Sequence, residues 1–104
     1  MRFLLAATLA LGLATPASAE WTKAQRKDFV ESCVTGCMST PNLPGDPRTL
    51  CTATCNCVAD EGEKLMTSAD FEAAEAAGAS GKTTPKMEQL QTQIPVCARK
   101  TMGR

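Results

Sequence analysis

Apolar residues recur at steps of three and four along the chain beyond residue 20, which is the pattern of amphipathic helices. The first predicted helix covers 22–38. Its apolar stripe consists of Phe29, Val30, Cys33, Val34, Cys37 and Met38. Thr22, with Gln25 three positions later, forms a capping-box pattern at its start. Residues 39–46 are rich in Pro, Gly, Asn and Asp, and they predict a loop.

A second helix is predicted over 47–66. Asp46 is a good N-cap, and Pro47 suits the first helical position because its missing N–H needs no partner there. The apolar face consists of Leu50, Cys51, Thr54, Cys55, Val58, Leu65 and Met66. Gly62 weakens the pattern, since glycine inside a helix costs about 1 kcal/mol relative to alanine. Two helices joined by a short loop are expected to lie antiparallel, so 22–66 predicts a helical hairpin.

Shorter helical segments follow the hairpin. Ser68 is the predicted cap of a helix over 69–77, with Phe71 as its buried anchor and Gly78 as its stop. Residues 79–83 then predict a flexible joint.

The last predicted helix begins at Thr84 and Pro85 and runs to about Gln93, with Met87, Leu90 and Ile94 as its apolar stripe. Pro95 is expected to interrupt it, which leaves a last turn around Cys97 and a frayed tail over 100–104. No segment has the alternating pattern of a strand. The predicted fold class is therefore all-α: a disulfide-stapled antiparallel helical hairpin with one or two additional C-terminal helices.

Residues 1–19 have the three-part pattern of a secretory signal peptide. Arg2 supplies the positive charge, and an apolar run of 11 residues follows over 3–13, which is too short to span a bilayer. The small residues at 17–19 predict cleavage between Ala19 and Glu20 and delivery to the periplasm or the medium. The remaining 20–104 is expected to form one domain, with the hairpin at 22–66, C-terminal helices at 68–98 and no stable membrane anchor.

The six cysteines give the clearest signal in the chain. Two Cys-x-x-x-Cys pairs, 33/37 and 51/55, each place both thiols on one helix face, about 6 Å apart along the axis. Across an antiparallel hairpin, geometry favours nested bridges, Cys37–Cys51 and Cys33–Cys55, over crossed ones. Cys57 and Cys97 are then left to join the C-terminal helix to the hairpin. Six cysteines allow 15 connectivities, so this pairing is a geometric preference.

Disulfides bring Cα atoms to about 4.4–6.8 Å, closer than ordinary helix axes lie. The residues between the paired cysteines are small, and they are Thr35, Gly36, Thr52, Ala53 and Thr54. We interpret Gly36 as the point of close contact between the two helices. The bridges are also needed for stability, because a chain with only Trp21, Phe29 and Phe71 as aromatics after the signal builds a small core.

The two pairs, Cys33-Val-Thr-Gly-Cys37 and Cys51-Thr-Ala-Thr-Cys55, are separated by 13 residues. This arrangement resembles the small chaperones of the mitochondrial intermembrane space and the plant α-hairpinin peptides. The resemblance covers 33–55 and implies the stapled hairpin without an activity, and we interpret it as convergent. The wider spacing of Trp21, Phe29 and the cysteines to Cys97 also resembles small uncharacterised secreted bacterial proteins.

The favoured function is a small exported, non-catalytic structural or protein-interaction module with an unknown protein partner. The candidate interaction loop contains Leu43, Pro44, Asp46 and Arg48, because loops held by a rigid scaffold are frequent binding sites. Net charge is zero and no basic stripe is present, so we expect no nucleic acid partner.

Two other functions stay open. Cys55-Asn56-Cys57 is a motif capable of thiol-disulfide exchange, but Asp60 and Glu61 follow it and negative charge raises a thiol pKa. Soft Cu(I) would suit thiolates with methionines, here Met38, Met66, Met87 and Met102, but only if the cysteines were reduced. We interpret these methionines as core residues and expect neither a metal nor another cofactor.

Most enzyme classes lack their residues in this sequence. With no histidine and no tyrosine, triads based on Ser-His or Cys-His and c-type haem attachment are excluded. The carboxylate pairs Asp60/Glu61 and Glu72/Glu75 lie on predicted solvated helix faces, where no catalytic cleft is expected. The sequence therefore predicts a protein that is not an enzyme.

Overall fold

The computed structural model describes residues 20–103, and the predicted signal peptide lies outside them. These residues contain five helices and no strand. The helices are α2 (Lys23–Met38), α3 (Pro47–Leu65), α4 (Ser68–Ala79), α5 (Pro85–Gln91) and α6 (Gln93–Met102). The all-α class and the stapled hairpin are confirmed. Within 20–103 we find no helix with both the length and the apolar character needed to cross a membrane.

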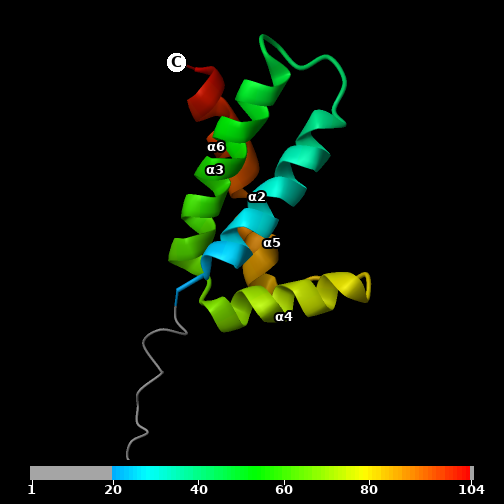
Figure 1. Ribbon diagram of the computed structural model, residues 1–104, viewed down its shortest axis with the longest axis vertical. Coiled ribbons are helices and arrows are strands. Elements are labelled where there is room, and N and C mark those ends of the chain that lie inside the picture. Colours follow the sequence, from blue (N-terminus) through cyan, green and yellow to red (C-terminus); the bar gives the residue numbers. More distant parts are fainter. Residues whose placement is uncertain (1–19, 104) are drawn as a thin grey trace, which may run out of the picture.

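The helix α3 is central to the fold. It lies antiparallel to α2, and the two are joined by the loop at 39–46 (Figure 1). After α4, which lies across the end opposite this loop, α5 and α6 return along α3 toward the loop (Figure 1). As a result α3 packs against α2 and against α6.

The predicted starts of the two hairpin helices are confirmed. At α2 the capping box is complete: Thr22 Oγ1 accepts from the Gln25 backbone N–H at 3.0 Å, and Gln25 Oε1 accepts from the Thr22 N–H at 2.8 Å. At α3, Asp46 is the N-cap and Pro47 the first residue. The Asp46 carboxylate, however, accepts from the Thr49 hydroxyl at 2.6 Å, and no side-chain bond caps the backbone there.

The start and the end of α4 differ from the prediction. Thr67, and not Ser68, is the N-cap, and Asp70 completes a second capping box by accepting from the Thr67 backbone N–H at 3.0 Å. Ser68 is the first helical residue instead. Gly78 does not stop the helix, which runs on to Ala79; the left-handed residue that turns the chain is Gly81, with φ 74°.

The C-terminal segment is more regular than predicted. Pro95 does not interrupt it, because Pro95 is the third residue of α6, where a backbone N–H has no intrahelical partner. The expected last turn around Cys97 is therefore a helix of 10 residues. It continues to Met102, so residues 100–102 of the predicted frayed tail are helical.

Trp21 is the centre of the core. Its side chain is 7 % exposed, and its ring centroid lies 4.7 Å from that of Phe71 and 5.4 Å from that of Phe29. Its Nε1–H donates to the Met66 carbonyl at 3.1 Å, which satisfies the one polar atom of the ring. The other buried members of this cluster are Val58, Ala59, Met66, Phe71, Leu90 and Cys97.

Gly62 lies in α3 beneath the Trp21 ring. A Cβ added at this position would meet Trp21 Cη2 at 2.7 Å and Leu90 Cδ2 at 3.2 Å. We expect Gly62→Ala to lower the free energy of unfolding by about 1–2 kcal/mol, because overpacking outweighs the gain in helix propensity. The matched variant Gly78→Ala adds the same methyl group in α4 with nothing within 4 Å, and should stabilise instead. Urea unfolding of both variants measures the difference, and a stabilised Gly62→Ala would contradict this packing.

Asp70 connects α4 to α5. Hydrogen bonds from the Thr67 backbone N–H and from Lys86 hold the pKa of Asp70 below its ordinary value. A lowered folded-state pKa stabilises the protein above the unfolded pKa, near 4, and this contribution is lost as pH falls through the folded pKa. We expect Asp70→Asn to lower the urea midpoint slightly at pH 7 and not at pH 2. The exposed Asp28→Asn is the control, and a pH-independent loss at Asp70 would contradict the assignment.

Candidate functional site

The cysteines form three disulfides in the structure. Cys33–Cys55 and Cys37–Cys51 have Cα separations of 5.8 and 5.7 Å, and they are nested across the hairpin as the geometric argument favours. The third bridge joins Cys57 to Cys97 with a Cα separation of 5.7 Å. No cysteine is free among the described residues. Cys55 and Cys57 thus have separate partners, one on α2 and one on α6.

Gly36 does not have the role that the sequence suggested. A Cβ at Gly36 would have nothing within 4 Å, so this residue is not the point of close contact between α2 and α3. The helices meet at the cysteines themselves, four residues apart on each helix, whose side chains point directly at each other. Gly36 lies on the flank of this contact line and is exposed.

An apolar groove of 470 Å³ runs along this flank, between α2 on one side and α5 and α6 on the other. Its first wall consists of Phe29, Ser32, Cys33, Gly36, Cys37 and Thr40. Its floor on α3 consists of Thr54, Cys55 and Val58. Its second wall consists of Met87, Leu90, Gln91 and Ile94. No charged side chain lines the groove.

The predicted interaction loop lies at the other end of α3 from α4. Pro44, Asp46 and Arg48 are exposed and Leu43 is half-buried. Asn42 and Gly45 have φ values of 62° and 63°, so two left-handed residues shape the turn. Arg48 belongs to the first turn of α3 and not to the loop itself.

A second hollow, of 370 Å³, adjoins this loop. It is lined by Pro44, Gly45, Asp46, Thr49, Leu50, Ala53, Thr101 and Met102, so the loop and the end of α6 form one continuous surface. Sequence reasoning included Pro44 and Asp46 in this surface and missed Met102, because the tail was expected to fray.

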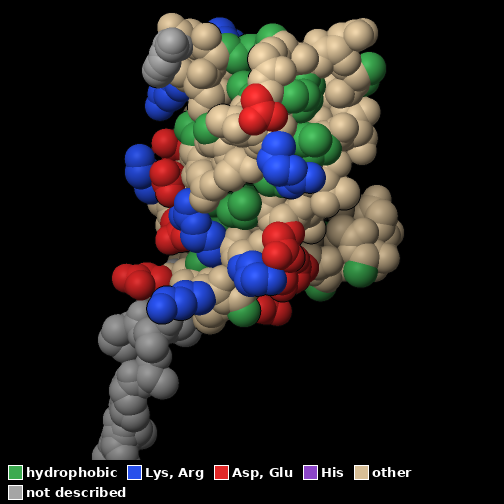
Figure 2. Space-filling model, turned by 45° about the horizontal axis from the view of Figure 1, so that its top comes forward, with side chains coloured by type: hydrophobic (Ala, Val, Ile, Leu, Met, Phe, Trp, Pro, Cys, Tyr) green, Lys and Arg blue, Asp and Glu red, His purple; other side chains and the backbone are tan. Residues whose placement is uncertain are grey.

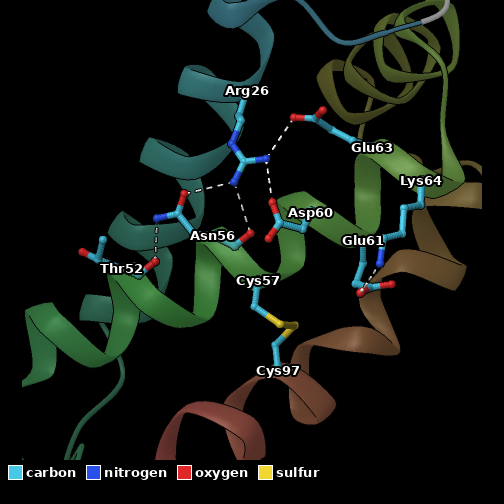
Figure 3. A network of polar contacts seen from close by, with 9 residues as sticks. All are labelled: Arg26, Thr52, Asn56, Cys57, Asp60, Glu61, Glu63, Lys64 and Cys97. Atoms are coloured by element: carbon cyan, nitrogen blue, oxygen red, sulfur yellow. Dashed lines mark hydrogen bonds and ion pairs between the residues drawn. A yellow bond between two sulfur atoms is a disulfide. The ribbon is translucent and has the colours of Figure 1, made fainter.

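Arg26 forms the largest ionic network among the described residues (Figure 3). Its guanidinium lies 2.9 Å from both Asp60 and Glu63, and it donates to the Asn56 carbonyl and side-chain oxygen at 3.3 and 3.1 Å. The hydrogen bond to Glu63, and next that to Asp60, raise the pKa of Arg26, while partial burial opposes them. This network joins α2 to α3 and is structural.

The carboxylate pairs noted in the sequence do not converge on one site. Asp60 pairs with Arg26, while Glu61 lies 3.4 Å from Lys64. Glu72 accepts from Gln25 at 2.8 Å and so connects α4 to α2. On the face shown in Figure 2, Lys and Arg side chains are interspersed with Asp and Glu. None of these carboxylates reaches the groove.

The four methionines considered for Cu(I) occupy different environments. Met66 is in the core, Met87 lines the groove, and Met38 and Met102 are exposed near the ends of α2 and α6. Over residues 20–103, no cluster of three or more His, Cys, Asp or Glu side chains is arranged to hold a metal ion.

Comparison with known proteins gives no relative. No family model, no curated protein and no solved structure matches the chain. The described residues offer two candidate binding surfaces: the loop surface, formed by the loop and the end of α6 around the 370 Å³ hollow, and the apolar groove.

Proposed function

We propose that this chain is a small exported protein-interaction module without catalytic activity, and that its loop surface binds the partner. The three disulfides support the location, because such bonds persist in an oxidising compartment outside the cytoplasm. The signal peptide at 1–19 and its cleavage before Glu20 belong to the same proposal. The periplasm or the medium is the proposed destination.

The observation that carries the proposal is the composition of the loop surface. Met102 lines the hollow beside the loop, and at 52 % exposed it is one of the three exposed large hydrophobic side chains of the described residues. Arg48 is exposed in the first turn of α3, directly after the loop. Methionine and arginine are enriched in protein interfaces, and arginine is a frequent hot spot.

The scaffold holds this surface rigidly. The Cys37–Cys51 bridge closes the base of the loop, one residue before the end of α2 and in the second turn of α3. A pre-ordered loop loses little entropy on binding. The partner is accordingly a folded protein with an apolar patch for Met102 and a carboxylate placed to meet Arg48.

Within this proposal, the resemblance to mitochondrial chaperones and α-hairpinins reflects convergence on the same stapled hairpin and not a shared function. The alternative roles in thiol-disulfide exchange or Cu(I) binding would each require a bridge to open first. Cys55 and Cys97 are each 1 % exposed, whereas their partners are half-buried, so one sulfur of each of these bridges is shielded from an attacking thiol. These alternatives predict turnover in an insulin-reduction assay or a bound copper ion in native mass spectrometry.

The experiment is affinity capture with the oxidised mature protein from the extracytoplasmic fraction of its own cells, followed by titration calorimetry with the protein recovered. We expect Arg48→Glu to weaken binding by about tenfold or more, because an interfacial cation is replaced by an anion. Lys82→Glu makes the same charge change at the exposed turn between α4 and α5, and should bind like the wild type.

Two results would overturn the proposal. One is that the folded, oxidised protein captures no specific partner. The other is that Arg48→Glu and Lys82→Glu change the affinity equally, which would place the contact away from the loop surface.

A further inference from the structure

We propose that the apolar groove is a binding site for a small single-chain amphiphile, such as a fatty acid, whose alkyl chain lies between α2 and the pair α5 and α6. The proposal is independent of the partner of the loop surface. The groove results from the way in which the disulfides attach two helices to α3.

Cys55 and Cys57 are two residues apart, so their side chains leave α3 about 200° apart around its axis. One bridge therefore holds α2 on one side of α3, and the other holds α6 on a different side. In Figure 3, Arg26 approaches α3 from one side while the Cys57–Cys97 bridge leads to α6 on the other. Of the two sectors between these attachments, the one with Asn56 and Asp60 is polar.

The opposite sector carries Thr54 and Val58, which form the groove floor. Packing of α2 is mainly against α3, and it does not close over this sector onto α6. Ile94 stands at the rim and is 45 % exposed, although Met87, Leu90 and Ile94 belong to one apolar stripe. The floor itself is closely packed, with Val58 1 % exposed, and the apolar surface that no segment among the described residues covers is that of Ile94 and the half-buried Phe29 and Met87.

The shape of the groove favours an alkyl chain. Its volume of 470 Å³ falls within the usual range for small-molecule sites. Its α2 wall extends from Phe29 to Cys37, a rise of roughly 12 Å at 1.5 Å per residue. Thr54 Oγ1 is within hydrogen-bond distance of Thr101 Oγ1, at 2.9 Å, so the floor offers no unpaired hydroxyl to a polar ligand.

The charge and size of the groove argue against a docked protein helix and against a charged group inside it. A protein helix docked here would bury much less than the roughly 800 Å² per partner that a stable interface needs. No Lys, Arg, Asp or Glu lines the groove, so a charged headgroup must remain in solvent at the rim. The polar groups at the edge are the hydroxyls of Ser32 and Thr40 and the amide of Gln91.

Gly36 gives the decisive variant. It lines the groove, and a Cβ added there has nothing within 4 Å, so Gly36→Leu directs a side chain into the volume proposed for the ligand. Leucine also favours a helix more than glycine does. Gly78→Leu is the matched control, because Gly78 is likewise an exposed helical glycine with nothing within 4 Å.

The test is fluorescence titration of the oxidised mature protein with 11-(dansylamino)undecanoic acid, with displacement by dodecanoate. We expect saturable binding with one site per chain, wild-type affinity in Gly78→Leu, and a loss of about tenfold or more in Gly36→Leu. Ile94→Asn at the rim provides a second variant and should also weaken binding. Far-UV circular dichroism verifies that each variant is folded.

Three outcomes would overturn the proposal: no saturable binding, equal affinity in Gly36→Leu and Gly78→Leu, or association only with phosphatidylglycerol vesicles and not with the free acid. The last outcome would indicate a lipid surface as the ligand. The Arg48→Glu experiment tests a different surface. If no fatty acid binds, the proposed protein-interaction function is unaffected; if no protein partner binds the loop surface, the proposal for the groove is unaffected.

Discussion

Trp21→Ala should lower the free energy of unfolding by about 3–5 kcal/mol, which is much of the stability expected for a domain of this size. The substitution removes the ring that packs between Phe29 and Phe71 and opens a cavity against Gly62, where no side chain can refill the space. It also leaves the Met66 carbonyl without its donor.

The measurement is urea unfolding followed by far-UV circular dichroism, because Trp21 is the only tryptophan and fluorescence is lost with it. Trp21→Phe should recover part of the loss, since it keeps an aromatic ring but not the indole N–H. Lys23→Ala, at an exposed position two residues later, should change stability by less than about 0.5 kcal/mol. A small effect of Trp21→Ala would show that the N-terminus is not anchored in the core.

Removal of both hairpin bridges should destabilise the second half of α2 in particular. The only buried residue of α2 is Gln25, in its first turn, and beyond Val30 the helix has no buried side chain. In the chain-entropy model each of these bridges contributes about 3 kcal/mol. We expect substitution of Cys33, Cys37, Cys51 and Cys55 by alanine to cost more than about 3 kcal/mol and to reduce the helical signal.

Hydrogen exchange locates the effect. The amides of 31–39 should lose protection, whereas those of α3 around Val58 should keep more of theirs, because Cys57–Cys97 still holds α6. The control is Thr35→Ala with Thr52→Ala, two exposed positions adjacent to the bridged cysteines. If the amides of α2 keep their full protection from exchange without the two bridges, then side-chain packing, and not the disulfides, holds α2 against α3.

The hairpin was predictable because its signals are local. Thr22 and Gln25 form a complete capping box within one turn, and the i,i+4 cysteine pairs are on one helix face for any straight helix. Neither inference needs knowledge of distant contacts. Asp46 and Pro47 likewise predicted where α3 begins. They did not predict that the Asp46 carboxylate accepts from the Thr49 hydroxyl and not from a backbone N–H.

The errors concern residues whose role depends on what lies opposite. From the sequence, Gly62 is a residue that weakens its helix. In the structure, the absence of a side chain at Gly62 makes space for the Trp21 ring. Gly36 reads as a contact, yet it faces open space. From the sequence, Pro95 is expected to interrupt a helix. In the structure, α5 ends at Gln91 and α6 begins at Gln93, so Pro95 lies in the first turn of α6, where proline is tolerated.

The loop surface and the groove also differ in whether local sequence is enough to predict them. Pro44, Asp46 and Arg48 could be selected from turn composition alone. The groove could not, because it depends on how α2 is placed relative to α5 and α6. Ser32, Gly36 and Thr40 are small, four apart and beside the cysteine face, but they mark only one wall and do not predict the opposite one.

Disulfide mapping of the purified, oxidised protein tests the central claim, that nested bridges hold α2 against α3. Thermolysin, which cleaves before apolar residues, can separate Cys33 from Cys37 at Val34, and Cys51 from Cys55 at Ala53. In the alkylated, unreduced protein, mass spectrometry should then find the Cys37 peptide linked to the Cys51 peptide alone, and no alkylated cysteine. A Cys33 peptide linked to the Cys51 peptide, or free thiols at these positions, would contradict the account.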